Sequence, residues 1–389
     1  MGPGWAERFA PFEGVAYLDA ASQGPIPLAA SRAGREALAL KERPWRIGTP
    51  TYVSAVAEVR ALAARLLGAR EESVALVTGA GQVVNVVARG LELGEGDEIV
   101  LARHEFPSNE LPWRWLARRG VAVRVVEPDH PTGAVSAERL AEAVGPRTRV
   151  VAFAHVSYLH GGRIEPGPVV EAARRFGAVT VVDGSQAAGA LPFDFGGSGV
   201  DVYAASAYKF LLGPYGCGLG LFSPQVLDRL AVGDVNWWSV RGAEDFNHLP
   251  EHIELFPGAQ RYDAHETAAF FNLLPLAESL RLLLEATPAV VQAHARALGD
   301  RLLERLPAGF SPASPLEPGA RSHLLCLRAQ TAAATQAAFE RLRAAKVWVA
   351  LRGDRIRVSP HLYSGLEDVE RLVAALAPGG RGGGGPVGV

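Results

Sequence analysis

The strongest fold signal in this chain is the stretch Val179-Thr180-Val181-Val182-Asp183-Gly184-Ser185-Gln186-Ala187. Its first part is a short, valine-rich apolar run, which is typical of a buried strand in a parallel sheet. The carboxylate of Asp183 ends that run, at the edge where doubly wound sheets bind their ligands. Because aspartate is also a common helix cap, Asp183 alone leaves its role open.

Strand-like and helical segments alternate on both sides of this stretch from about residue 54 onward. The predicted strands are 73–77, 98–102, 121–126, 149–155, 179–183 and 218–222, and the predicted helices are 55–67, 82–91, 110–119, 137–144 and 169–176. Such alternation predicts an α/β fold with a mainly parallel sheet and helices on both faces. After Pro257 the pattern changes to long helices over 264–286 and 289–306, followed by short strands and helices.

The domain organisation follows from this change and from the length of 389 residues, which suits a large domain plus a smaller one. We expect a large domain over 15–256 that binds a cofactor, and a small α+β domain made of 1–14 and 257–378. The glycine-rich segment 379–389 has no core material and is predicted to be a disordered tail.

Composition excludes several classes of partner. The formal net charge of −2 gives no reason to expect nucleic acid or an anionic membrane as a partner. No run of about 18 apolar residues predicts a membrane span. The two cysteines, Cys217 and Cys326, lie far apart and indicate a reducing compartment. We therefore expect a cytoplasmic protein.

Lysine is scarce, with only Lys41, Lys209 and Lys346 in the chain. Lys209 lies in an apolar and glycine-rich segment, Ala204 to Gly218, which does not resemble a solvated surface. Apolar surroundings disfavour the charged form of an amine and so make it a usable nucleophile for a carbonyl. The alternative is a surface lysine with a buried stem.

Asp183 and Lys209 together match the needs of pyridoxal phosphate. That cofactor needs an amine for its aldehyde and an anion beside its ring nitrogen, so that the ring can accept electrons from a substrate carbon. Its phosphate needs backbone N–H groups, preferably at the start of a helix. The turn Thr78-Gly79-Ala80-Gly81, between a predicted strand and a predicted helix, supplies such groups.

These motifs resemble the class V aminotransferase family of fold type I enzymes, which includes cysteine desulfurases, kynureninase and isopenicillin-epimerase-like proteins. The resemblance runs from Tyr17-Leu18-Asp19-Ala20-Ala21 to the helical segment that begins at Leu366. It is most specific at 182–187 and at Ser206-Ala207-Tyr208-Lys209, where Lys209 follows Asp183 by 26 residues. The resemblance implies a mainly parallel, seven-stranded sheet and pyridoxal 5'-phosphate as cofactor.

The resemblance also implies a role for each matching position. Lys209 would hold the cofactor as a Schiff base and then move protons, and Asp183 would pair with the ring nitrogen. Further cofactor contacts would come from Gln186 and Tyr158 near the ring hydroxyl, Phe106 stacked on the ring, and Ser206, Tyr208 and the backbone of Ala80 and Gly81 at the phosphate. Arg357 would receive the substrate carboxylate, with Arg355 on the same strand face as the competing choice.

For the reaction, the resemblance favours an aminotransferase acting on an amino acid or related amine. An epimerase like that of isopenicillin N, or a hydrolase or lyase like kynureninase, is the alternative. A cysteine desulfurase is disfavoured, because such enzymes need a cysteine ahead of the carboxylate-binding arginine and residues 349–354 contain none. Relatives also carry a Gly-Thr pair that reaches the partner's phosphate, where this chain has His265-Glu266-Thr267, so that contact stays open.

Two further sequence features are less specific indications of function. Trp237, Trp238 and Phe246 are candidates for a substrate entrance, and the tryptophans are equally good candidates for core or subunit interface. The segment His248-Leu249-Pro250-Glu251-His252 fits a zinc-protease pattern that works only on a helix, which Pro250 would strain. We therefore predict no metal.

The expected partners are a small amino-acid substrate and a second copy of the chain. The family builds its sites at a subunit interface, and a two-fold dimer is the commonest assembly of identical chains. We expect a homodimer with the site at that interface.

Overall fold

The structure is a computed structural model that describes residues 4–243, 245 and 247–377. The predicted tail 379–389, residues 1–3 and Pro378 of the predicted small domain, and Phe246 lie outside the described residues. The proposed boundary between the domains near residue 256 stays a prediction.

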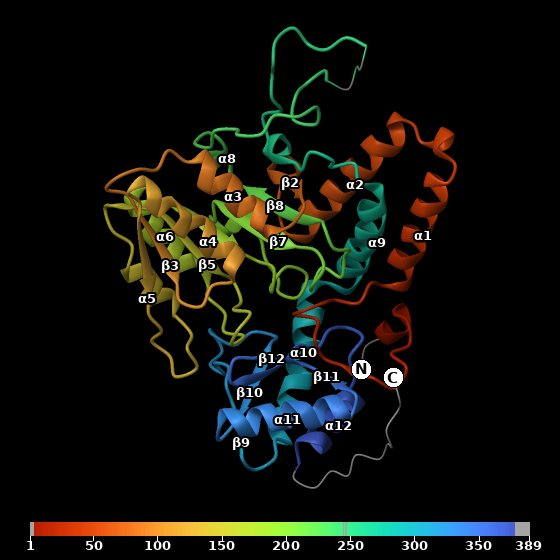
Figure 1. Cartoon of the computed structure of the whole chain (residues 1–389), viewed down its shortest axis with the longest axis vertical. Coiled ribbons are helices and arrows are strands. Elements are labelled where there is room, and N and C mark those ends of the chain that lie inside the picture. Colours follow the sequence, from red (N-terminus) through yellow and green to blue (C-terminus); the bar gives the residue numbers. More distant parts are fainter. Residues whose placement is uncertain (1–3, 244, 246, 378–389) are drawn as a thin grey trace.

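A seven-stranded sheet runs through the upper part of the molecule as drawn in Figure 1. Its strands, in spatial order, are β2 (Val74–Val77), β8 (Gly218–Phe222), β7 (Val202–Ser206), β6 (Val179–Asp183), β5 (Thr148–Ala154), β3 (Glu98–Ala102) and β4 (Ala122–Val126). Strand β8 runs antiparallel to both of its neighbours, and all other pairs are parallel. The prediction of an α/β fold with a mainly parallel sheet is confirmed. The sequence pattern alone missed β7, which precedes Lys209.

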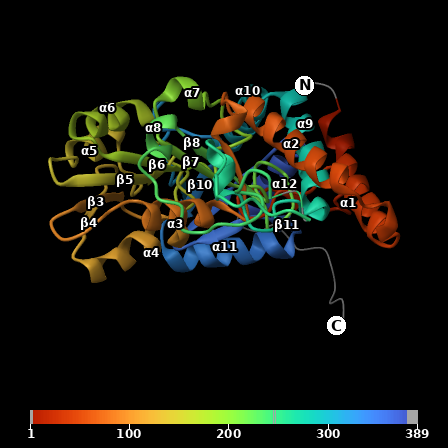
Figure 2. The ribbon, with the colours of Figure 1, turned by 90° about the horizontal axis from the view of Figure 1, so that it is seen from above.

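Side chains on the two faces of the sheet belong to two separate apolar cores. On β5, Val151 and Phe153 pack with the helices α5 (Ala137–Glu142) and α6 (Pro166–Phe176), whereas Val150 and Ala152 face α3 (Ala80–Gly90) and α4 (Pro107–Trp115). Figure 2 shows these two pairs of helices on opposite sides of the sheet. A sheet covered on both faces needs strands that are apolar throughout, which explains the continuous valine-rich runs.

Three long helices stand together beside the sheet (Figure 1). They are α1 (Leu28–Lys41), α2 (Thr49–Leu66) and α9 (Phe270–Ala286), and α9 packs against both others. The predicted helix over 264–286 begins six residues late. The preceding chain is held at β2 instead, where the Asp263 carboxylate pairs with Arg60 and accepts from the Leu76 N–H.

The C-terminal part carries a second, four-stranded sheet in the order β12 (Ala350–Arg352), β13 (Arg355–Val358), β10 (Leu325–Ala329) and β9 (Phe310–Pro312). Its core includes side chains of α10 (Pro288–Glu304), α11 (Ala332–Ala344) and α12 (Leu366–Leu376). A two-stranded sheet of β1 (Ala16–Tyr17) and β11 (Val347–Trp348) joins the first strand of the chain to this part. None of the described helices is both long and apolar enough to cross a membrane.

Candidate active site

Lys209 lies in the turn that follows β7 and is 7 % exposed. Its Nζ lies 5.2 Å from the centre of the Phe106 ring and 5.5 Å from that of Tyr208. Burial lowers the pKa of Lys209 to about 8, with Asp183 opposing the shift and two arginines adding to it. The amine is therefore a far better nucleophile near neutral pH than an ordinary lysine.

Asp183 ends β6, directly beside Ala204 of β7, and is buried. Its Oδ1 accepts a hydrogen bond of 2.8 Å from the Ser185 N–H. The chain can turn away here only because residue 184 is glycine, since a Cβ at that position would lie 2.1 Å from the Tyr203 ring. The carboxylate is thus held at the carboxyl edge of the sheet, as the sequence predicts for a ligand-binding group.

Gln186 supplies a buried acceptor beside this carboxylate. Its Nε2 donates to the Ala21 carbonyl at 3.0 Å, and its Oε1 has no partner among the described residues. A buried polar atom without a partner costs stability, and a hydroxyl on a bound ring would satisfy it. The local chemistry therefore fits a ring that carries a hydroxyl group.

The start of α3 lies against the end of β7. The Ala80 N–H donates to Ser206 Oγ at 3.2 Å. The approach is close because Gly218 on β8 has no side chain; a Cβ there would lie 2.8 Å from the Cα of Gly79. Free N–H groups and the helix dipole favour an anion at such a helix start. Ala80, Gly81 and Ser206, predicted to contact a phosphate, are thereby brought together.

Tyr208 and its neighbour Tyr215 form a stacked pair in the loop between β7 and β8. Their ring centres are 4.0 Å apart with planes at 18°. Burial, and then the hydrogen bond with Tyr215, raise the pKa of Tyr208 to about 12. Its hydroxyl therefore stays protonated and can serve as a donor.

Phe106 precedes α4 and is 36 % exposed, which excludes the simple interpretation of a core residue. Its ring meets Tyr158 edge to face, with centres 5.3 Å apart. The half-exposed ring lies on the side of the site where Lys209 Nζ approaches it. It is therefore free to stack on a flat ligand held at the amine.

Arg357 is 1 % exposed and within electrostatic reach of Lys209, whereas the guanidinium of Arg355 is bound elsewhere. Arg357 donates to the Tyr158 carbonyl at 2.8 Å and to Ser22 Oγ at 2.7 Å, and it pairs with Asp19 at 3.2 Å. Arg355 instead donates to the carbonyl of Thr132 and pairs with the neighbouring Asp354. The geometry favours Arg357 over Arg355 as the carboxylate receptor.

Sequence reasoning missed Glu105. This buried carboxyl accepts 2.8 Å hydrogen bonds from the Ala154 N–H and from Asn109 Nδ2, so it ties the start of α4 to the end of β5. Burial raises the pKa of Glu105 to about 8. The available signal was a carboxylate that follows a predicted strand, immediately before Phe106.

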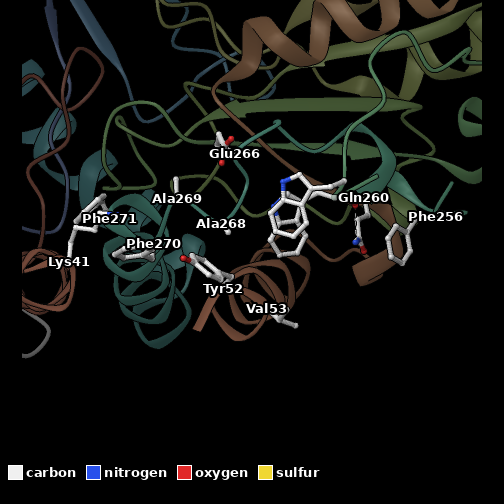
Figure 3. A pocket seen from close by; sticks show the side chains of 12 residues that line it. Lys41, Tyr52, Val53, Phe256, Gln260, Glu266, Ala268, Ala269, Phe270 and Phe271 are labelled. Carbon is white, nitrogen blue, oxygen red and sulfur yellow. Dashed lines mark hydrogen bonds between the residues drawn. The ribbon is translucent and has the colours of Figure 1, made fainter. Parts of the chain in front are cut away.

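The two tryptophans line a different cavity. Trp237 and Trp238, with aromatic side chains of α2 and α9, surround a cavity of about 610 Å³. Figure 3 shows Tyr52, Phe270 and Phe271 along one part of its wall and Phe256 and Gln260 at the other end. Lys209 and the other predicted cofactor residues are not among the described residues that line it. A role for the tryptophans at an entrance to the Lys209 site is therefore not supported.

The cysteines and the zinc-protease pattern lie apart from this chemistry. Cys217 and Cys326 are buried, and burial raises the pKa of their thiols to about 12 and about 11. Residues 248–252 form bends and irregular chain rather than a helix, and His248 pairs with Asp245. Within residues 4–243, 245 and 247–377, no three His, Cys, Asp or Glu side chains gather as a metal-binding group.

A buried amine and a buried carboxylate at the carboxyl edge of a mostly parallel sheet define the class of site. The fold matches solved structures over nearly its whole length. A cystine C–S lyase, solved in complex with its product cysteine persulfide, superposes with a TM-score of 0.84 at 23 % identity, over 94 % of this chain and 99 % of that one. A cysteine desulfurase from Escherichia coli gives 0.83 at 20 % identity, over 96 % of each chain.

The chain belongs to the class V aminotransferase family, whose model matches residues 17–372. Among curated proteins, the isopenicillin N epimerase of Streptomyces clavuligerus is 31 % identical, over 93 % of this chain and 94 % of its own length. A probable cysteine desulfurase of Pseudomonas aeruginosa is also 31 % identical, over 94 % of this chain and 93 % of its own. The family resemblance drawn from the sequence is confirmed.

Proposed function

We propose that this chain is a pyridoxal-phosphate enzyme that moves a proton at the α-carbon of an amino-acid substrate, with epimerisation as the outcome. The cofactor is pyridoxal 5'-phosphate. The observation that carries the proposal is the buried amine of Lys209, which faces the half-exposed ring of Phe106 and has Asp183 as its electrostatic partner. Membership of the class V family supports it.

Each residue of the site would have a role set by its position. When bound, the cofactor supplies an electron sink for the substrate α-carbon. Lys209 would hold it covalently through Nζ, and Asp183 would keep the proton on its ring nitrogen. The start of α3 with Ser206 and Tyr208 would bind the phosphate, and Phe106, Tyr158 and Gln186 would hold the ring. Lys209 Nζ would take the α-proton from one face of the substrate α-carbon, and inversion would follow when a proton from solvent is delivered to the opposite face.

The outcome departs from the transamination expected from the sequence. The similar proteins support epimerisation better than transamination, because a protein named isopenicillin N epimerase matches over nearly the full length of both chains. Relatives named cysteine desulfurases match as well. Sulfur transfer to a protein thiolate is disfavoured here, because the β12–β13 turn contains only Gly353 and Asp354 and both cysteines are buried.

We predict that the cofactor-loaded protein will exchange the α-proton of its substrate for deuterium and form the other enantiomer. Each common L-amino acid would be incubated in D₂O, with proton NMR for exchange and chiral chromatography for the enantiomer. Accumulation of a keto acid would establish transamination in place of epimerisation. If the protein holds no cofactor, or exchanges no α-proton, the proposed function is wrong.

We also propose that the chain is a homodimer with the Lys209 site at the interface. Val53 of α2 and Phe271 of α9 are 46 % and 39 % exposed beside the aromatic cavity, and Trp45 just before α2 is 78 % exposed. Exposed apolar surface of this kind is typical of an interface between subunits. Light scattering at micromolar concentration should give twice the mass of one chain, and a mass of 41.2 kDa would contradict the proposal.

A further inference from the structure

Three arginines lie on one face of the β12–β13 hairpin. Arg352 pairs directly with Arg355 across the hairpin, and Ala350 pairs with Arg357. Residues that pair across an antiparallel ladder, and residues two apart on one strand, point to the same face. The two-residue turn, with Gly353 at φ +58°, keeps Arg352 at the end of this rigid ladder.

Arg352 and Arg357 converge on a single hydroxyl. Arg352 Nη2 donates to Ser22 Oγ at 3.1 Å, and Arg357 Nη2 donates to the same oxygen at 2.7 Å. A neutral hydroxyl is a weak partner for two cations, because guanidinium groups form their strongest hydrogen bonds with carboxylate or phosphate oxygens. The pair therefore forms a place where an anion would be better bound than Ser22.

The three arginines of the hairpin differ in whether a nearby carboxylate compensates their charge. Arg357 has the buried carboxylate of Asp19 beside it, and Arg355 has Asp354. In the part of the chain that the structure describes, no carboxylate lies within 4.0 Å of the Arg352 guanidinium. Among the three, Arg352 is the cation left for a ligand.

The charge of Arg352 also acts on Lys209 and on Asp19. The positive charges of Arg357 and Arg352 both lower the pKa of Lys209, and both oppose the rise in the pKa of Asp19 that burial causes. Arg352 is therefore within electrostatic reach of the reacting amine. A substrate whose α-carboxylate lies at Arg357 would have this second guanidinium close to it, because both arginines donate to the same Ser22 oxygen.

We propose that Arg352 binds a second carboxylate of the substrate, so that the site selects amino acids with an acidic side chain. This inference rests on the proposed function and deepens it. Arg357 would bind the α-carboxylate that all amino acids share, and Arg352 would distinguish a side-chain carboxylate from the corresponding amide. The bidentate geometry of a guanidinium suits this discrimination.

The test compares isosteric acids and amides on the cofactor-loaded protein. L-glutamate and L-aspartate would be titrated against L-glutamine and L-asparagine, with the cofactor absorbance as the binding signal. We expect at least one acid to bind about 10- to 100-fold more tightly than its amide, as one charge-assisted hydrogen bond allows. Arg352→Gln should remove this preference and leave amide binding within about threefold, and Arg352→Lys should restore part of it.

Arg355→Gln is the matched control, because it removes a charge from the same hairpin face without touching Ser22, and it should keep the preference. Equal binding of acid and amide by the unaltered protein, or a preference that survives Arg352→Gln, would overturn the assignment to Arg352 alone. A protein that holds no cofactor, or responds to no amino acid, would instead reject the proposed function and this inference with it.

Discussion

Replacing Lys209 with alanine is expected to lower turnover by at least about 10³-fold, the upper part of the range for a positioned acid–base group. The variant loses both the amine that would hold the cofactor and the group that would move the α-proton. Its fold should persist, because the side chain makes no ion pair with the described residues and alanine fits a buried turn. Turnover and circular dichroism measured together would separate lost chemistry from lost structure.

The two other lysines are the natural controls. Lys41 and Lys346 lie at the end of α1 and just before β11, and their alanine variants should keep their activity. Borohydride treatment and peptide mapping of the unaltered protein should place the cofactor on the peptide that contains Lys209. Attachment of the cofactor to either other lysine, or full turnover by Lys209→Ala, would reject the assigned role.

The rate at which the cofactor attaches to the protein should depend on pH through the lowered pKa of Lys209. Only the neutral amine attacks an aldehyde, and burial lowers the pKa of Lys209 to about 8 from 10.5. The rate of cofactor attachment to the cofactor-free protein should therefore rise as the pH increases through about 8 and level off above it. A rate that keeps rising towards pH 10 would indicate a solvent-exposed lysine instead.

The second large effect is expected for Asp183→Asn, which keeps the shape of the side chain and removes its charge. We expect turnover to fall by about 10²- to 10³-fold, the range seen when one preorganised electrostatic contact is removed. The amide oxygen can still accept from the Ser185 N–H, so stability should change little. Rates under saturating cofactor, with thermal unfolding as the companion measurement, test this.

Asp201→Asn provides a structural contrast. Asp201 accepts hydrogen bonds from the N–H and hydroxyl of Thr180 near the start of β6, at the end of that strand away from Asp183. Its loss should destabilise the fold with little effect on turnover at low temperature. If Asp183→Asn lowers only stability and leaves the rate unchanged, the pairing of Asp183 with the ring nitrogen is wrong.

The sheet was largely predictable because its strands carry a local signal. A strand buried on both faces must be apolar throughout, and β6 was predicted over the same five residues that the structure shows. β7 was missed, although Tyr203 and its neighbours are buried, because Tyr-Ala-Ala-Ser is a weak strand pattern. The late start of α9 depends on Asp263 meeting Arg60 across 203 residues, which no local window reveals.

The candidate site was predictable where a residue type is tied to one chemistry. A lysine among apolar neighbours, 26 residues after a carboxylate at a strand end, indicated both the cofactor and the family. Arg352 had no such signal, because an arginine near a turn is ordinary by its local sequence. The choice between Arg355 and Arg357 was equally hidden, because both lie on the same strand face.

The sequence by itself determined the class of fold and the family and indicated Lys209 as the proposed reactive amine, because apolar periodicity and a few chemically distinctive residues are local properties. Tertiary structure alone decided which arginines act on Lys209, that Arg352 and Arg357 meet at Ser22, and that Trp237 and Trp238 line another cavity. These outcomes depend on contacts between residues far apart in the chain, such as Ser22 with Arg352, which are 330 positions apart. Packing and strand register create such contacts, and no local pattern encodes them.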